Sequence, residues 1–200
     1  MFPPLPLDIW SIAPPPLPLV AQANRSSPDR TRRFPLRREG GGTRGACAAR
    51  LVAHLVPPDG LLDPGPQPIL GVIEGDSPAA VPLALRWSDD ERIEPARRGA
   101  SLRLLLLSAP ISAGLWESFP ACEGSTEPPA PPARSLLGPG PRSSAAANGV
   151  ARNSLRVLWS RCGERVATAE LLAAWDYSHL ADRLPPTLPV VCTTPSPSGG

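Results

Sequence analysis

The chain has 200 residues, the length of one domain with appendages, and a formal charge of only +2 at pH 7. It contains 30 Pro and 17 Gly, a content close to that of low-complexity chains, together with 20 Arg and no Lys. No apolar run approaches the roughly 20 residues that cross a membrane, and two His with four dispersed Cys argue against a zinc site.

The absence of Lys has a genetic explanation. Lys codons are A-rich, whereas the codons of Arg, Pro, Gly and Ala are GC-rich, so a GC-rich gene produces this composition. A spurious or poorly evolved reading frame would produce it too, and the composition alone leaves that alternative open.

Residues 1–45 are predicted to form a disordered arm rich in Pro and Arg. The motif PPLPL occurs at residues 3–7 and again at 15–19, and Pro at this density favours a solvated polyproline II helix. Such segments bind WW-type and SH3-type modules, so a proline-rich interaction protein is one hypothesis and a low-complexity linker is the other. A signal peptide is not expected, because the segment lacks a basic start, carries Asp8 and has prolines that interrupt a helix.

The charge is unevenly distributed along the chain. Residues 25–50 carry eight Arg and two acids, a local charge of +6, and the rest of the chain carries −4. A basic arm can attract phosphate groups. Nucleic-acid modules, however, interleave aromatic side chains for stacking, and this stretch has only Phe34. We therefore expect a solvated arm that does not bind nucleic acid.

Residues 46–112 are predicted to form the first half of a small antiparallel β domain. Clusters of Pro, Gly, Asp and Ser separate apolar or alternating stretches, which is typical of short strands joined by turns. In the first stretch, His54 is interpreted as a strand residue and not as a ligand. The stretches are 51–56, 69–74, 83–87 and 102–107.

A charged connection, SDDERIEPARRG at residues 88–99, joins two of these strands. Pro95 cannot donate to a ladder, so the connection is not expected to be strand. Its four acids are a candidate cation site, but the loop lacks the ligand spacing and the central Gly of an EF-hand. We expect a surface loop in which acids and arginines neutralise one another: Asp89, Asp90, Glu91 and Glu94 against Arg92, Arg97 and Arg98.

Residues 113–152 are predicted to be a low-complexity insertion, because Pro, Gly, Ser and Ala dominate them. The second half of the β domain covers 153–196, with strands at 155–159 and in the segment PTLPVVCTT. Between these strands, residues 166–183 are rich in helix formers and precede a Pro-Pro pair, which indicates a single helix. The predicted fold class is therefore mainly β.

The alternation also predicts the core. Small domains bury a modest share of their surface, so few side chains are needed. The expected core residues are Val52, Val56, Ile73, Leu83, Leu85, Trp87, Leu102, Leu104, Leu106, Val157, Trp159 and Val190.

No catalytic, cofactor-binding or metal site is predicted, and we expect a non-enzymatic protein. The competing hypothesis is a hydrolase that uses His179 with Asp176 or Asp182, but adjacency in sequence does not make a triad, whose members meet through the fold. The four Cys contain no C-x-x-C pair. Their even number permits two disulfides, yet nothing in the sequence indicates secretion.

One set of positions carries a family resemblance. A strand, an acidic connection with Pro and a Gly-x-Ser step into a second strand occur at Trp87, Asp89, Asp90, Pro95, Gly99 and Ser101. They are followed by LRVLWSRCGERV and WDYSHLADRLPPTLPVV. This order resembles the N-terminal β domain of phage and prophage tail-tip, or baseplate-type, structural proteins, over about residues 50–195.

The resemblance implies a virion component that packs against other protein subunits and has no catalytic residues. It also implies a strand at 166–183, where helix propensity predicts a helix. The Pro-rich insertion departs from the family's pattern.

Overall fold

The structure of the protein is a computed structural model. It describes residues 36–41, 50–87, 90–108, 111–122, 130–139 and 145–194. Both PPLPL motifs, Asp8 and Phe34 therefore lie outside the described residues, as do Cys47 and Asp89. Residues 36–41 of the predicted arm are described, and Glu39–Gly40 form strand β1 rather than a disordered segment.

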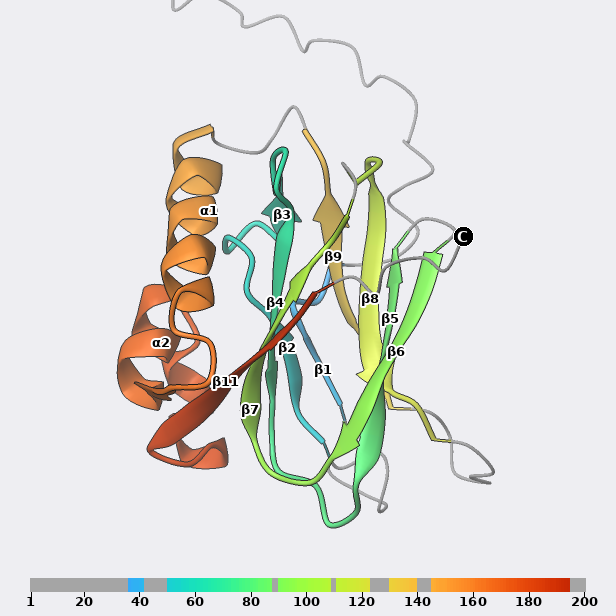
Figure 1. The fold of residues 1–200 in the computed structure, drawn as a ribbon, viewed down its shortest axis with the longest axis vertical. Coiled ribbons are helices and arrows are strands. Elements are labelled where there is room, and N and C mark those ends of the chain that lie inside the picture. Colours follow the sequence, from blue (N-terminus) through green and yellow to red (C-terminus); the bar gives the residue numbers. More distant parts are fainter. Residues whose placement is uncertain are drawn as a thin grey trace, which may run out of the picture. The chain divides into compact units, whose positions relative to one another are not determined.

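The first of two sheets has five strands in the order β3-β9-β8-β5-β6 (Figure 1). Its neighbouring strands are antiparallel, except that β3 and β9 are parallel. The strands are β3 (Leu61–Leu62), β5 (Val81–Trp87), β6 (Asp90–Arg97), β8 (Gly114–Pro120) and β9 (Ala133–Leu137).

The second sheet has six strands in the order β1-β2-β4-β7-β11-β10. Only β7 and β11 run parallel in it, and the other neighbours are antiparallel. Besides β1, its strands are β2 (Val52–His54), β4 (Ile69–Glu74), β7 (Ser101–Leu106), β10 (Arg165–Ala167) and β11 (Thr187–Thr193).

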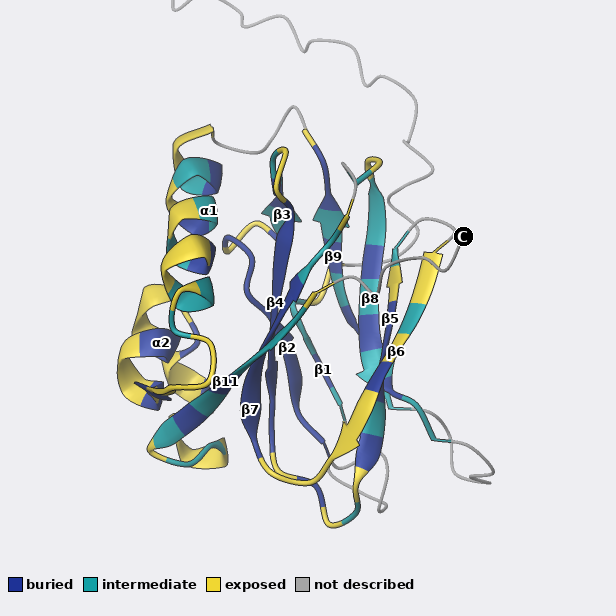
Figure 2. Ribbon diagram, viewed as in Figure 1, coloured by how far each residue is buried: buried dark blue, intermediate teal, exposed yellow. Residues whose placement is uncertain are grey.

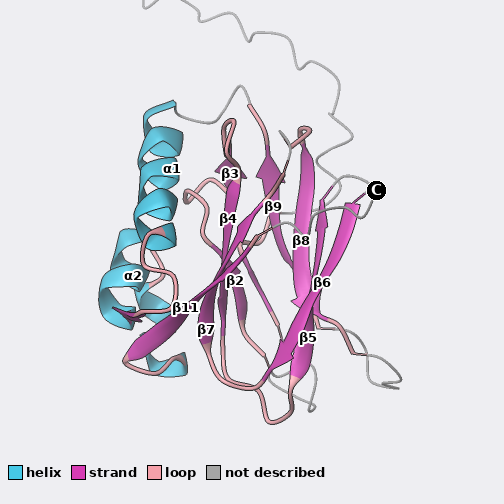
Figure 3. Cartoon of the chain, viewed as in Figure 1, coloured by secondary structure: helices cyan, strands magenta, loops and turns pink. Residues whose placement is uncertain are grey.

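Helices cover the outer face of the six-stranded sheet, so this sheet lies between the helices and the five-stranded sheet (Figures 1 and 3). The helices are α1 (Ala145–Trp159), α2 (Thr168–Ala174) and the 3-10 helix η2 (Ser178–Arg183). On α1, Asn148, Ala151 and Leu155 are buried at the 3–4-residue spacing of one helix face.

The central layer explains why β4 and β7 are buried on both faces, with buried residues concentrated there in Figure 2. Gly71 of β4 lets α1 approach closely, because a Cβ at this position would lie 2.8 Å from Leu155 Cδ2. Leu104 is paired with Gly71 in the ladder and therefore faces the helices too. Arg103, the next residue along β7, points to the five-stranded sheet.

The mainly β fold class is confirmed, but both sheets are mixed rather than purely antiparallel. Residues 166–183 contain helix as expected, but as two short helices, α2 and η2, rather than a single one. Of the strand that the tail-tip resemblance implies there, only residues 166–167 form, as the end of β10. Most predicted core residues are buried, but Val157 is 54% exposed, and Trp87, Leu106 and Trp159 are only partly buried. Trp116, absent from the predicted core, is fully buried.

Three predicted segments are wrong. Residues 90–97 form strand β6 rather than a loop, because β6 is the edge of its sheet, where a Pro is tolerated. The predicted insertion, 113–152, contains β8, β9 and the start of α1. The predicted strand at 155–159 belongs to α1, because the Ala-rich start at 145–147 continues into it as one helix.

Candidate functional site

A cluster of buried charges joins the two sheets. Arg103 donates from Nε to Glu74 Oε2 at 3.0 Å and from Nη1 to Glu94 Oε2 at 3.0 Å. The three side chains come from β7, β4 and β6, and each is at most 1% exposed. Ser101 and Thr193 add hydroxyl donors to the same two carboxylates. This cluster is closed to solvent and is structural.

Arg50 extends the cluster toward the chain before β2. Its guanidinium donates to the carbonyl oxygens of Gly75, Val81 and Arg97 at 3.2, 2.9 and 3.0 Å. Burial lowers the pKa of Arg50, and the carboxylate of Glu74, 3.5 Å from Nη2, opposes this effect. Since its donors are engaged by the protein itself, Arg50 is not available to a ligand.

His54 lies fully buried between the sheets. Its ring stacks on Trp116 at a centroid distance of 3.5 Å, and Nδ1 lies 2.9 Å from Ser135 Oγ. Nε2 has no hydrogen-bond partner. Burial alone lowers the pKa of His54 well below its usual value. The prediction that His54 is a structural strand residue agrees with this placement.

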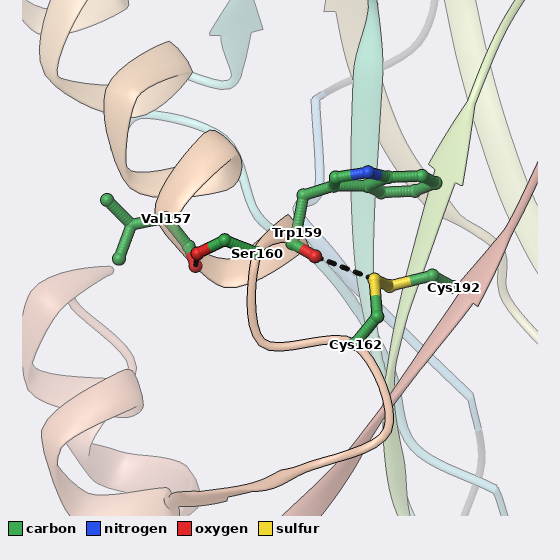
Figure 4. The surroundings of a disulfide bond; sticks show 5 residues. All are labelled: Val157, Trp159, Ser160, Cys162 and Cys192. Atoms are coloured by element: carbon green, nitrogen blue, oxygen red, sulfur yellow. Dashed lines mark hydrogen bonds between the residues drawn. A yellow bond between two sulfur atoms is a disulfide. The ribbon is translucent and has the colours of Figure 1, made fainter.

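A disulfide between Cys162 and Cys192 ties the turn after α1 to β11 (Figure 4). The carbonyl oxygen of Trp159, the last residue of α1, lies 2.7 Å from Cys162 Sγ. Cys122 is disulfide-bonded as well, so all cysteines among the described residues are oxidised. The sequence permits such bonds but gave no reason to expect them.

Among the described catalytic and cation-binding candidates, His179, Glu91 and Glu94 have separate surroundings. His179 contacts Glu39 of β1, with Nε2 2.8 Å from Oε1, at an exposed position. Of the acids at 89–94, Glu91 pairs with Arg86 on the surface at 2.8 Å, whereas Glu94 is buried. The described residues contain no group of three or more His, Cys, Asp or Glu that could hold a metal ion.

An apolar groove of about 280 Å³ opens where α1, the end of α2 and the loop after β2 meet. Only one of its lining side chains is ionisable, the carboxylate of Asp176. Val150 stands at the rim and is 69% exposed. The lining residues are Val56, Pro57, Pro58, Ala147, Val150, Ala151, Ser154, Ala173, Ala174, Trp175 and Asp176.

Short-range structure shapes one wall of this groove. Asp176 ends α2 in the left-handed conformation, with φ of 59°, which Asp tolerates better than most residues. The amide of Tyr177 then donates to the carbonyl oxygen of Leu172 at 2.8 Å. This turn leaves the Asp176 side chain 76% exposed at the rim.

Arg38 connects the two walls of the groove, the loop after β2 and the end of α2. Its Nη1 donates to the carbonyl oxygens of Val56 and Trp175 at 3.3 and 3.2 Å, and Nη2 lies 3.8 Å from Asp176 Oδ2. The guanidinium also stacks over the ring of Tyr177, 4.5 Å from its centroid. The walls are therefore held by the protein itself, and the groove is preformed.

Sequence reasoning missed the groove because its parts lie far apart in the chain. Pro57 and Pro58 were interpreted only as a turn, and residues 147–151 as an insertion. The local signal that could have been used is the Val among small residues at 147–151.

Comparisons of the chain with family models, with curated proteins and with solved structures find no match. No helix among the described residues is long and apolar enough to span a membrane.

Proposed function

We propose that this protein is a non-catalytic binding module that holds an apolar segment of a protein partner in the groove between α1 and α2. The observation that carries the proposal is the groove itself, a preformed apolar hollow with Val150 exposed at its rim. Concave apolar sites with few polar groups are where proteins bind ligands. A volume of about 280 Å³ accepts one or two aliphatic side chains rather than a large cofactor.

The charge of the rim defines the partner further. Asp176 presents its carboxylate at one end of an otherwise uncharged lining. Arg38, its ion-pair partner, is only 15% exposed, whereas the Asp176 side chain is 76% exposed and so stays open to a partner. The partner segment that complements this arrangement has an aliphatic residue next to an Arg or Lys. Complementary charge of this kind mainly sets the register of binding.

The disulfides support an oxidising compartment as the place where this module works. Disulfides persist in oxidising compartments and are rare where thiols are kept reduced. The bond between Cys162 and Cys192 and the oxidation of Cys122 fit a protein that works in an oxidising compartment.

The earlier functional hypotheses stay predictions. A tail-tip component that packs against other subunits would also use a protein-binding surface, but most of the strand that the resemblance implies at 166–183 is helical. The PPLPL ligands for WW-type or SH3-type modules lie at 3–7 and 15–19, outside the described residues.

A displayed library of random 12-residue peptides tests the proposal. We expect the selected peptides to share an aliphatic residue beside Arg or Lys. Val150→Glu places a charge at the rim and should weaken their binding at least tenfold. Asp176→Asn should weaken it less and should reduce the preference for the basic residue.

Val157→Glu is the matched control, because Val157 lies on the same helix and is exposed but does not line the groove. This variant should bind the peptides as the unmodified protein does. Peptides that bind Val150→Glu and Val157→Glu equally well would contradict the proposal, as would a library that yields no binder.

A further inference from the structure

His54 is placed where a charge would be least tolerated. It belongs to β2 of one sheet, while its stacking partner Trp116 belongs to β8 and its hydrogen-bond partner Ser135 to β9 of the other. A protonated ring needs acceptors for two N–H groups. Ser135 can serve Nδ1, but Nε2 faces no partner within the described residues. The closed sandwich therefore holds the neutral ring.

The charged groups around His54 do not offset a proton on it. From β1, the Arg38 carbonyl accepts the His54 amide, and the Arg38 side chain is directed to the groove walls. The carboxylate of Glu39 contacts His179 of η2. Arg50, which precedes β2, and Glu74 of β4 belong to the buried charge cluster.

The other sheet and the helical layer offer no counter-charge either. Glu117 of β8 and Arg134 of β9 pair with each other at 2.7 Å. Tyr177, whose pKa burial raises, is neutral, and its hydroxyl donates to the carbonyl oxygen of His54. Asp176 is exposed at the groove rim.

The same residue is connected to the groove through its backbone. The carbonyl oxygen of His54 accepts hydrogen bonds from Tyr177 Oη at 2.6 Å and from the Val56 amide at 3.0 Å. Val56 lines one wall, and Tyr177 directly follows Trp175 and Asp176 of the other. An opening in which β2 moves to expose His54 to water therefore acts on both walls through these two hydrogen bonds.

We propose that His54 is a pH-dependent switch for the α1–α2 groove. In mildly acidic surroundings, protonation of the His54 ring favours a conformation in which the two sheets separate, and in this conformation the groove loosens and releases its occupant. The release of an occupant rests on the proposed function above, whereas the opening itself does not. Below a pH of about 6.5, the usual pKa of His, the population of the open form should rise about tenfold per pH unit. Between pH 7.5 and 5.0 the rise is about 30-fold.

Two measurements on the whole chain test this without any ligand. Amide hydrogen exchange, corrected for the intrinsic effect of pH, reports opening at Val56. Fluorine NMR of protein labelled with 5-fluorotryptophan reports the groove through Trp175, one of five Trp, which a Trp175→Phe variant assigns. We expect Val56 protection to fall about 30-fold from pH 7.5 to 5.0, with the Trp175 resonance shifting over the same range.

The variants His54→Phe and His54→Gln remove the titrating group, the first keeping a ring against Trp116 and the second keeping a partner for Ser135. Either one that folds should show no pH response at Val56 or Trp175. His179→Gln, the control at the other His, should respond as the unmodified protein does. The inference fails if the His54 variants retain the response, or if Trp175 is insensitive to pH while Val56 opens. Failure of peptide binding alone would overturn the proposed function and leave the opening standing.

Discussion

Replacing Arg103 by Ala tests whether the buried charge cluster holds the two sheets together. The change removes two hydrogen bonds of 3.0 Å, one to Glu74 and one to Glu94, and leaves both carboxylates buried. Removing one partner of a buried ion pair costs about 3–5 kcal/mol, because the remaining charge is uncompensated. Glu94 keeps Arg92 at 2.6 Å and Glu74 keeps Arg50 at 3.5 Å, so we expect the lower end of this range.

Urea unfolding, followed by Trp fluorescence without reductant, measures this loss. A typical domain has only about 5–15 kcal/mol of stability, so the variant should unfold at a clearly lower urea concentration. Adding Glu74→Gln to Arg103→Ala should recover part of the loss, because it removes one unpaired buried charge. Arg86→Ala, which removes the exposed Arg86 guanidinium that pairs with Glu91 and Glu117, should leave the midpoint nearly unchanged. A loss below about 1 kcal/mol for Arg103→Ala, or no recovery in the double variant, would refute the reasoning.

The remaining predictions concern the interior and the disulfide. Trp116→Ala removes a fully buried ring and should cost about 3–5 kcal/mol in the same assay, whereas a cost near zero would mean that the ring is not packed as described. Cys162→Ser with Cys192→Ser opens a link across 30 residues and should cost about 3–4 kcal/mol, and an equal midpoint for variant and unmodified protein would contradict this. Because burial lowers the pKa of His54, its contribution to stability is complete above pH 6.5 and is lost as pH falls toward the lowered value, by about 1.4 kcal/mol per pH unit. Urea midpoints from pH 7.5 to 5.0 check that slope, which should be absent in His54→Gln.

The sequence predicted the fold class because apolar side chains recur at every second residue in the strands that pack one face against the helices or the other sheet. Leu83, Leu85, Leu102 and Leu104 are all buried, as the alternation requires. It failed at 155–159, where Leu155 and Val157 alternate with polar residues as in a strand but lie on different faces of α1: Leu155 is buried and Val157 exposed. Short apolar runs do not separate these two periods.

The amino-acid composition led to a wrong prediction at β8 and β9. Pro, Gly and Ser are frequent around them and made 113–152 look like an insertion, yet Trp116, Ser118, Ala133 and Ser135 form part of the sandwich interior. Buried Ser is invisible to a hydrophobic pattern. Arg103 is missed for the opposite reason, since a charged residue in an apolar strand is normally assigned to a solvated face. Its partners Glu74 and Glu94 come from other strands, which only the fold brings together.

The position of the groove follows from how the helical layer covers its sheet. Helix α1 is brought against β4 by Gly71, where no side chain holds it off, while Pro57 and Pro58 force the chain after β2 out of the ladder and beside α2. The last turn of α2 then bends away at Asp176, because the left-handed residue ends the helix there. A gap lined by Ala and Val results, since no large side chain is available from α1 to fill it. The variant Ala147→Leu fills that gap from within. If the groove is only a packing defect, the variant should raise the urea midpoint. If the groove is a binding site, the variant should abolish peptide binding without lowering the urea midpoint.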